Sequence, residues 1–161
     1  MSNTYSQIIL QIVFAVKFRQ QRIDKAWKEE LHTYIAGIIN KSHHRCLIVN
    51  SMPDHIHILV SVRPHPSISD LVREIKKTTS IWINERMIEN RDRRSRFRWQ
   101  EGFAVFSYNT SMKQIIYDYI LNQEKHHEKT RFSREFTYLM KDNELDFDPI
   151  YAGEFLMDDT G

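Results

Sequence analysis

The sequence predicts an α+β fold built on a four-stranded antiparallel sheet. The prediction rests on the order of apolar patterns along the chain, on start signals before the later helices, and on a length that fits one domain. The chain has 161 residues, of which 41% are hydrophobic and 12% aromatic, as in ordinary globular proteins. With only four Gly and four Pro, it offers little material for long flexible linkers.

The first half of the chain predicts three strands and one helix. Residues 6–18 are apolar at nearly every position, which is typical of a strand buried on both faces. Apolar residues recur at helical spacing over residues 24–40, so we expect a helix there. Residues 46–50 and 55–62 predict two further strands, joined by a short turn at residues 52–54.

The second half predicts two longer helices and one strand. The Ser-x-x-Asp signal at residues 67–70 opens a helix that we expect to run to about residue 89. A charged loop at residues 90–96 precedes a strand over residues 98–108, interrupted near Gly102. A second start signal at residues 111–114 opens a helix that we expect to continue to about residue 128.

The predicted order is therefore β-α-β-β-α-β-α. Its first six elements match the split βαβ, or ferredoxin-like, plan: a four-stranded antiparallel sheet with two helices on one face. The seventh element is an added C-terminal helix. We expect residues 1–132 to form the functional domain and residues 133–161 to form an extension. That extension would hold a short helical piece and an acidic tail, either packed with the same domain or flexible.

Two histidines flank one isoleucine in the predicted strand at residues 55–62. Successive side chains on a strand point to opposite faces, so His55 and His57 share one face. Imidazole is the commonest side-chain metal ligand, and the pair therefore suggests a metal site. The alternative for an isolated His-x-His is a pair of structural histidines, because short motifs also occur by chance.

Charge is distributed unevenly along the chain. Residues 72–98 hold nine basic and four acidic residues, whereas residues 134–161 hold two basic and eight acidic ones. A basic middle segment favours a polyanionic partner, and the arginine spacing of residues 91–98 favours nucleic acid over a merely solvated surface.

A tyrosine and a glutamine lie four residues apart on the predicted last helix. Tyr119 and Gln123 would share one face of that helix. A tyrosine hydroxyl, with a pKa of about 10, becomes a useful nucleophile when a base or metal lies near its target. A glutamine oxygen is a hard ligand suited to Mg²⁺ or Mn²⁺. The alternative is a packed tyrosine and a solvated glutamine.

Together these features resemble the HUH-superfamily single-tyrosine transposases of bacterial insertion sequences and their relatives associated with repetitive extragenic palindromes (REP). The resemblance covers most of the chain, from residue 13 to about residue 127, and is sharpest at residues 53–59 (PDHIHIL) and 119–123 (YILNQ). It implies an enzyme that cuts and rejoins single-stranded DNA beside hairpins. Tyr119 would form a covalent 5′-phosphotyrosine link, and His55, His57 and Gln123 would hold one Mg²⁺ or Mn²⁺.

The resemblance also implies the partners. Such enzymes act as homodimers with composite sites, in which one subunit supplies the histidines and the other the tyrosine helix. DNA binding would then fall to basic residues of the strand end, the second helix and the arginine loop: Lys17, Arg19, Arg73, Lys76, Lys77, Arg93, Arg94, Arg96 and Arg98.

Other functions stay open at this stage. The chain could be a domesticated REP-type nickase, a non-catalytic nucleic-acid-binding module, or a small metallohydrolase that uses the histidine pair. Cys46 is the only cysteine, we see no signal peptide, and no apolar run approaches the length of a membrane span. We therefore expect a cytoplasmic protein without a membrane partner.

Overall fold

The computed structural model describes residues 4–17, 22–87, 96–127 and 132–145. The chain divides into two compact units, Met1–Leu121 and Asn122–Gly161. The predicted boundary at residue 132 stays a prediction. No helix within the described ranges is both long and apolar enough to cross a membrane.

The first unit contains the predicted four-stranded sheet. Its strands are β1 (Ile9–Ala15), β2 (Arg45–Met52), β3 (His55–Ser61) and β4 (Ala104–Tyr108), in the order β2-β3-β1-β4. All neighbouring strands are antiparallel. This order is that of the ferredoxin-like plan, and it confirms the predicted fold class.

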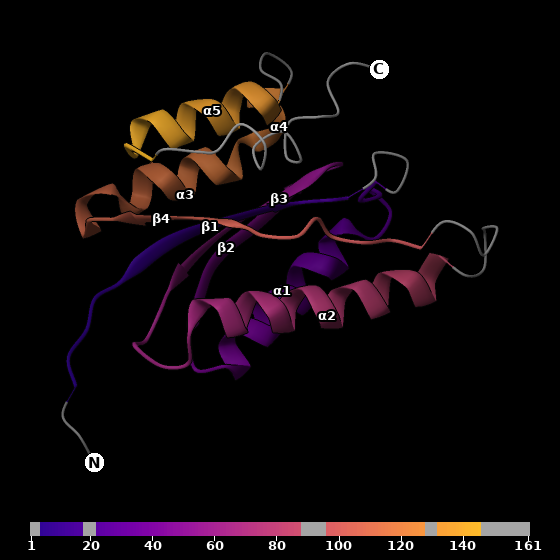
Figure 1. The fold of residues 1–161 in the computed structure, drawn as a ribbon, viewed down its shortest axis with the longest axis horizontal. Helices are drawn as coiled ribbons and strands as arrows, with labels where there is room; N and C mark the ends of the chain where they lie inside the picture. The colour runs from indigo at the N-terminus through magenta and orange to yellow at the C-terminus, as the bar shows by residue number, and fades with distance from the viewer. Residues whose placement is uncertain (1–3, 18–21, 88–95, 128–131, 146–161) are drawn as a thin grey trace. The chain divides into compact units, whose positions relative to one another are not determined.

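Two helices cover one face of the sheet, α1 (Lys28–Lys41) and α2 (Ile68–Met87) (Figure 1). The Ser67 hydroxyl accepts a hydrogen bond from the Asp70 amide at 3.2 Å, so the predicted start signal of α2 is confirmed. Between these helices and the sheet lies the main core. Its fully buried members alternate along the central strands and recur at helical spacing: Ile12, Phe14, Ile56, Ile58, Leu31, Ile35, Ile39 and Ile75.

A shorter helix, α3 (Lys113–Leu121), packs on the opposite face of the sheet (Figure 1). It follows a 3-10 turn, Thr110–Met112, which Asn109 caps by accepting a hydrogen bond from the Ser111 amide. The helical segment therefore begins earlier than the predicted Ser111 start signal. Ile120 of α3 is buried beside Ile9 and Leu59 in a small second core.

The single long helix predicted for residues 111–128 is wrong, because the helix is interrupted at Asn122. Tyr119 lies in α3, whereas Gln123 begins α4 (Gln123–His127), so the two residues do not lie on one continuous helix. A physical cause is present in the first unit. The Asn50 amide of β2 donates to the Ile120 carbonyl at 2.7 Å and to the Leu121 carbonyl at 3.4 Å, which satisfies carbonyls at the helix end.

The second unit contains α4 and α5 (Phe132–Asp142). On α5, apolar residues recur at helical spacing, and the rings of Phe132 and Phe136 lie 6.0 Å apart. The predicted acidic tail lies largely at residues 146–161, outside the described residues.

The Asn50 contact yields a stability prediction. Asn50→Ala removes the donor to the two α3 carbonyls, and we expect the last turn of α3 to open about 5- to 10-fold more often, in line with a loss of about 1 kcal/mol. Hydrogen–deuterium exchange of peptides covering residues 113–121 measures this. Asn40→Ala is the matched control, because it removes a different asparagine contact, to the Cys46 amide. Equal protection of α3 in both variants would contradict the assigned role.

Candidate functional site

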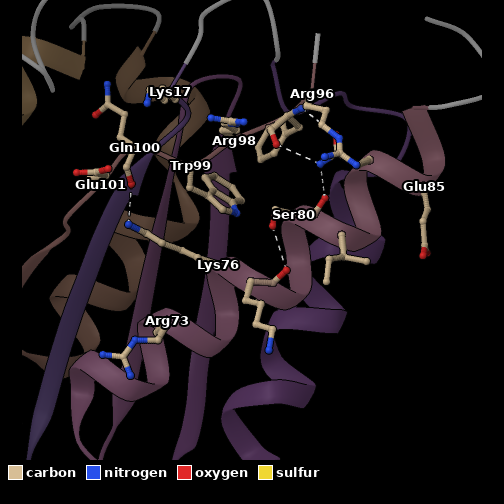
Figure 2. Close-up of a pocket in the computed structure, with 14 residues that line it drawn as sticks. Lys17, Arg73, Lys76, Ser80, Glu85, Arg96, Arg98, Trp99, Gln100 and Glu101 are labelled. Carbon is tan, nitrogen blue, oxygen red and sulfur yellow. Dashed lines mark hydrogen bonds between the residues drawn. The ribbon is translucent and has the colours of Figure 1, made fainter. Parts of the chain in front are cut away.

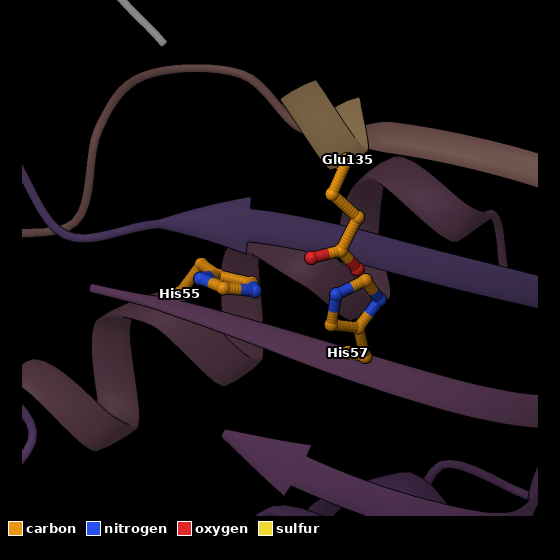
Figure 3. A group of neighbouring side chains, drawn as sticks. All are labelled: His55, His57 and Glu135. Atoms are coloured by element: carbon orange, nitrogen blue, oxygen red, sulfur yellow. The ribbon is translucent and has the colours of Figure 1, made fainter. Parts of the chain in front are cut away.

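His55 and His57 lie side by side on β3 (Figure 3). Both side chains are fully buried, and their ring centroids are 5.0 Å apart. The neighbouring Ile56 and Ile58 point into the main core on the other face, as the alternation of a strand requires. The predicted shared face of the two histidines is confirmed. Glu135, the third residue drawn in Figure 3, belongs to α5 of the second unit.

A carboxylate orients His55. The Nδ1 atom of His55 lies 2.6 Å from Oδ1 of Asp54, the residue that precedes it at the turn between β2 and β3. A metal-ligating histidine commonly donates its other ring N–H to a carboxylate, which fixes the tautomer and the ring orientation. This contact favours Nε2 of His55 as the atom that would bind a metal.

An amide on β1 contacts His57. Nδ1 of His57 lies 3.0 Å from the side-chain amide of Gln11, which is itself fully buried. Candidate ligand atoms of the two imidazoles lie within 4.8 Å of each other. Two adjacent imidazoles are a donor set that fits a divalent cation, and Asp54 already faces Nδ1 of His55 with a carboxylate acceptor.

Tyr119, a candidate nucleophile of α3, lies beside this pair. Its ring lies edge-on to His57, with 6.2 Å between the ring centroids. Asn50, which holds the end of α3, is the register partner of His57 on β2. The paired residues His57 and Asn50 therefore bring together the imidazole and the end of the helix that carries Tyr119. Gln123 begins α4 in the second unit, and its role as the third ligand stays a prediction.

A basic cavity of about 730 Å³ lies between α2 and residues 96–101 (Figure 2). Six cationic side chains and two carboxylates line it, the carboxylates being those of Glu85 and Glu101. The six are Lys17, Arg73, Lys76, Lys77, Arg96 and Arg98, which are all the predicted DNA-binding residues that lie within the described ranges. The other three, Arg19, Arg93 and Arg94, lie outside the described residues.

The cavity wall at residues 96–99 follows the alternation of a strand. Phe97 and Trp99 are buried, whereas Arg96 and Arg98 are exposed. Trp99 forms a bridge with Val16, and the Arg98 carbonyl accepts a hydrogen bond from the Lys17 amide at 2.9 Å. This segment therefore extends the sheet beyond β4, with the predicted interruption marked by the positive φ of Gly102, 81°.

Polar contacts from α2 hold this wall in place. The Asn84 side chain bonds both the amide and the carbonyl of Phe97, at 2.8 and 3.1 Å. The Lys76 ammonium donates to the carbonyls of Gln100 and Gly102. Burial lowers the pKa of Lys76 to about 8, against an opposing effect of Glu101. Lys76 thus shapes the cavity as well as contributing charge to it.

Sequence reasoning missed three polar residues that organise these sites: Gln11, Asn50 and Asn84. Gln11 had a visible signal, because it is the one polar residue in the apolar run Ile9–Ala15. A polar side chain in a strand buried on both faces needs a partner, and that partner is here a candidate ligand. Asn50 and Asn84 carried no comparable signal, since each lies in a strand or helix of mixed character.

Comparisons with known proteins identify the family and the fold. The sequence model of the family described as "Transposase IS200 like" matches residues 4–123, most of the chain. The transposases for insertion sequence element IS200 of Salmonella typhimurium and Salmonella typhi are each 26% identical to this chain over 113 residues. That stretch covers 70% of this chain and 74% of each relative.

Two solved structures share the fold. One is a protein of Deinococcus radiodurans R1 with a provisional transposase assignment, at a TM-score of 0.60 and 18% identity, covering 76% of this chain and 95% of that one. The other is a REP-associated tyrosine transposase bound to a REP hairpin, at a TM-score of 0.56 and 17% identity, covering 79% of this chain and 73% of that one. The sequence match over residues 4–123, together with the shared fold, shows that the chain belongs to the IS200-like transposase family.

Proposed function

We propose that this transposase cleaves and rejoins single-stranded DNA beside hairpins, with Tyr119 as the nucleophile. The observation that carries the proposal is the contact of the Tyr119 ring with His57, in a chain that belongs to a transposase family. A tyrosine beside two buried imidazoles has the elements of nucleophilic catalysis assisted by a metal.

In the proposed step, the Tyr119 oxygen bonds to phosphorus and the phosphorus–O3′ bond breaks. The phenolic proton passes to solvent, and the departing oxygen takes a proton to become a free 3′-hydroxyl. The product is a 5′-phosphotyrosine link. Its energy is close to that of the broken phosphodiester, so a 3′-hydroxyl can later attack it and reseal a strand without an external energy source.

His55, His57 and Gln123 would hold one Mg²⁺ or Mn²⁺. When bound, the ion would polarise the scissile phosphate and stabilise the charge that builds on its oxygens. The chain's own contribution is orientation. Asp54 and Gln11 fix the two imidazoles through Nδ1, and Asn50 holds the end of the tyrosine helix.

The basic cavity is the proposed DNA-binding surface. Six cations in a 730 Å³ cavity suit a phosphate backbone, and one solved relative of this fold is bound to a REP hairpin. Strand β1 links the two regions, because Ala15 pairs with His55, and Lys17, two residues further on, lines the cavity.

We also propose that the enzyme acts in the cytoplasm as a homodimer with composite sites, in which α3 of one subunit serves the histidines of the other. Within this chain Tyr119 already contacts His57. An exchange of α3 between subunits would reproduce this contact across the dimer.

The catalytic proposal predicts a covalent adduct that depends on Tyr119. Incubation of the purified protein and Mn²⁺ with a labelled single-stranded oligonucleotide, carrying a hairpin from its own gene's flanks, should yield a band that migrates slowly on a denaturing gel. Tyr119→Phe and removal of the metal by a chelator should each abolish it. Tyr117→Phe is the matched control, because it removes a tyrosine hydroxyl from the same helix, and it should retain the adduct.

The other outcomes separate the alternatives. Cleavage without an adduct would indicate a metallohydrolase, and binding of the hairpin without cleavage would indicate a non-catalytic module. A domesticated nickase would form the adduct, so the assay groups it with the mobile transposase. Mixing Tyr119→Phe with His57→Ala should restore part of the activity if the sites are composite, and none if each chain forms its own site.

The cavity predicts salt-dependent binding. In the Tyr119→Phe background, which prevents cleavage, Arg98→Gln should reduce the slope of log affinity against log salt by about 1, because one phosphate contact is lost. Fluorescence anisotropy with the same hairpin measures the slope. Lys41→Gln, a substitution at an exposed residue of α1 outside the cavity, is the control. If Arg98→Gln has the same salt slope as the parent protein, Arg98 does not contact the DNA phosphates.

The lowered pKa of Lys76 predicts that DNA binding depends on pH. Its pKa of about 8 means that its positive charge is lost as pH rises through 8. DNA affinity should therefore fall between pH 7 and pH 9, by about threefold to tenfold at constant salt. Lys76→Arg, which stays charged, should flatten this part of the profile. If the DNA affinity of Lys76→Arg falls equally between pH 7 and pH 9, the decline must come from the titration of another group.

A further inference from the structure

A chain of hydrogen bonds runs across three strands on the face of the sheet that carries the histidines. The Tyr108 hydroxyl of β4 donates to Oε1 of Gln11 on β1 at 2.8 Å, and the Gln11 amide nitrogen lies 3.0 Å from Nδ1 of His57 on β3. The register accounts for this alignment. Val13 pairs with His57, Ile9 pairs with Tyr108, and Gln11 lies between Ile9 and Val13 on the same face of β1.

Gln11 is an unusual residue for this position. It is 0% exposed on a strand that is otherwise apolar and buried throughout. An apolar residue would pack there without the cost of dehydrating an amide. The retained amide contacts two side chains, and one of them is the candidate metal ligand His57.

Metal binding restricts the proton of His57. An imidazole that binds a metal through Nε2 carries its proton on Nδ1, and that N–H needs an acceptor. The Gln11 amide nitrogen faces Nδ1, and an amide N–H can only donate; with the amide in this orientation Nδ1 accepts, and the proton of a neutral His57 lies on Nε2. Turning the terminal amide by 180° brings its oxygen to Nδ1. The Tyr108 hydroxyl can accept as well as donate, so it stays bonded to the amide in either orientation.

We propose that Gln11 is a positioning residue that sets the tautomer of His57, and that its amide turns over when a divalent cation binds at Nε2. The inference rests on the proposed role of His57 as a ligand. His55 has a fixed carboxylate partner in Asp54, which accepts but never donates once it is ionised. The two imidazoles are thus supported differently: Asp54 serves one tautomer of His55, whereas the Gln11 amide can serve both tautomers of His57.

The test combines a spectroscopic measurement with a binding measurement on the full chain. Nitrogen-15 spectra of the imidazole rings report which nitrogen of His57 carries the proton, first without metal and then with diamagnetic Mg²⁺. We expect the proton on Nε2 without metal and on Nδ1 with it. A proton on Nδ1 both with and without metal would contradict the proposal that the Gln11 amide turns over when the metal binds.

Titration calorimetry with Mn²⁺ provides the second readout. Gln11→Met keeps the size of the side chain but removes the acceptor, and should weaken Mn²⁺ binding about 10- to 100-fold. Gln11→Glu restores an acceptor and should bind within about threefold of the wild type. Tyr108→Phe should produce a smaller loss. Gln7→Met, an exposed residue two positions before β1, is the matched control and should change nothing.

The outcomes distinguish this inference from the proposed function. If Gln11→Met binds Mn²⁺ as tightly as the wild type, the positioning role is overturned while the metal site stands. If Gln11→Glu is as weak as Gln11→Met in a folded protein, the role is structural and the inference also fails. If His57→Ala binds Mn²⁺ like the wild type, the proposed metal site itself is wrong.

Discussion

The pairing of β3 between β1 and β2 is the constraint on which the rest of this structure depends. Its isoleucines, Ile56 and Ile58, are fully buried in the main core, which fixes the register of the strand. A slip of one residue would exchange the two faces and would place the imidazoles in that core. Hydrophobic packing beneath α1 and α2 therefore holds His55 and His57 side by side on the opposite face. The candidate site gains its rigidity from a core that takes no part in the chemistry.

The same strand alternation builds the basic cavity at the end of β1. Phe97 and Trp99 pack inward, Trp99 edge-on to Phe14 at 4.9 Å between ring centroids, and Arg96 and Arg98 are left exposed. Burial of the two aromatic side chains stabilises the conformation of this segment. The arginines that alternate with them are therefore held in place without being buried themselves. Lys17 follows the strand that pairs with β3, so β1 connects the charged surface with the strand that carries the histidine pair.

Sequence alone predicted the fold class and the shared face of the histidines, because both follow from periodicity. It also singled out nine basic residues as candidate DNA contacts, and the six of them that lie within the described ranges line the cavity. It failed at Asn122. Local propensity favours one continuous helix there, and the end of α3 instead depends on Asn50, some 70 residues away. Partners of this kind leave no local pattern. Gln11 is the intermediate case: its polarity within an apolar strand was visible, but its partners, Tyr108 and His57, become apparent only when three strands are aligned.

The central claim is that the Tyr119 hydroxyl is the group that bonds to DNA, and mass spectrometry of the reacted protein tests it most directly. After nuclease trimming of the bound strand, tryptic digestion releases the peptide of residues 114–125, which contains both Tyr117 and Tyr119. Fragment ions that carry the added nucleotide phosphate on Tyr119 are the expected result. The same mass on Tyr117, or an unmodified peptide from protein that has cut its DNA, would contradict the assignment of the nucleophile.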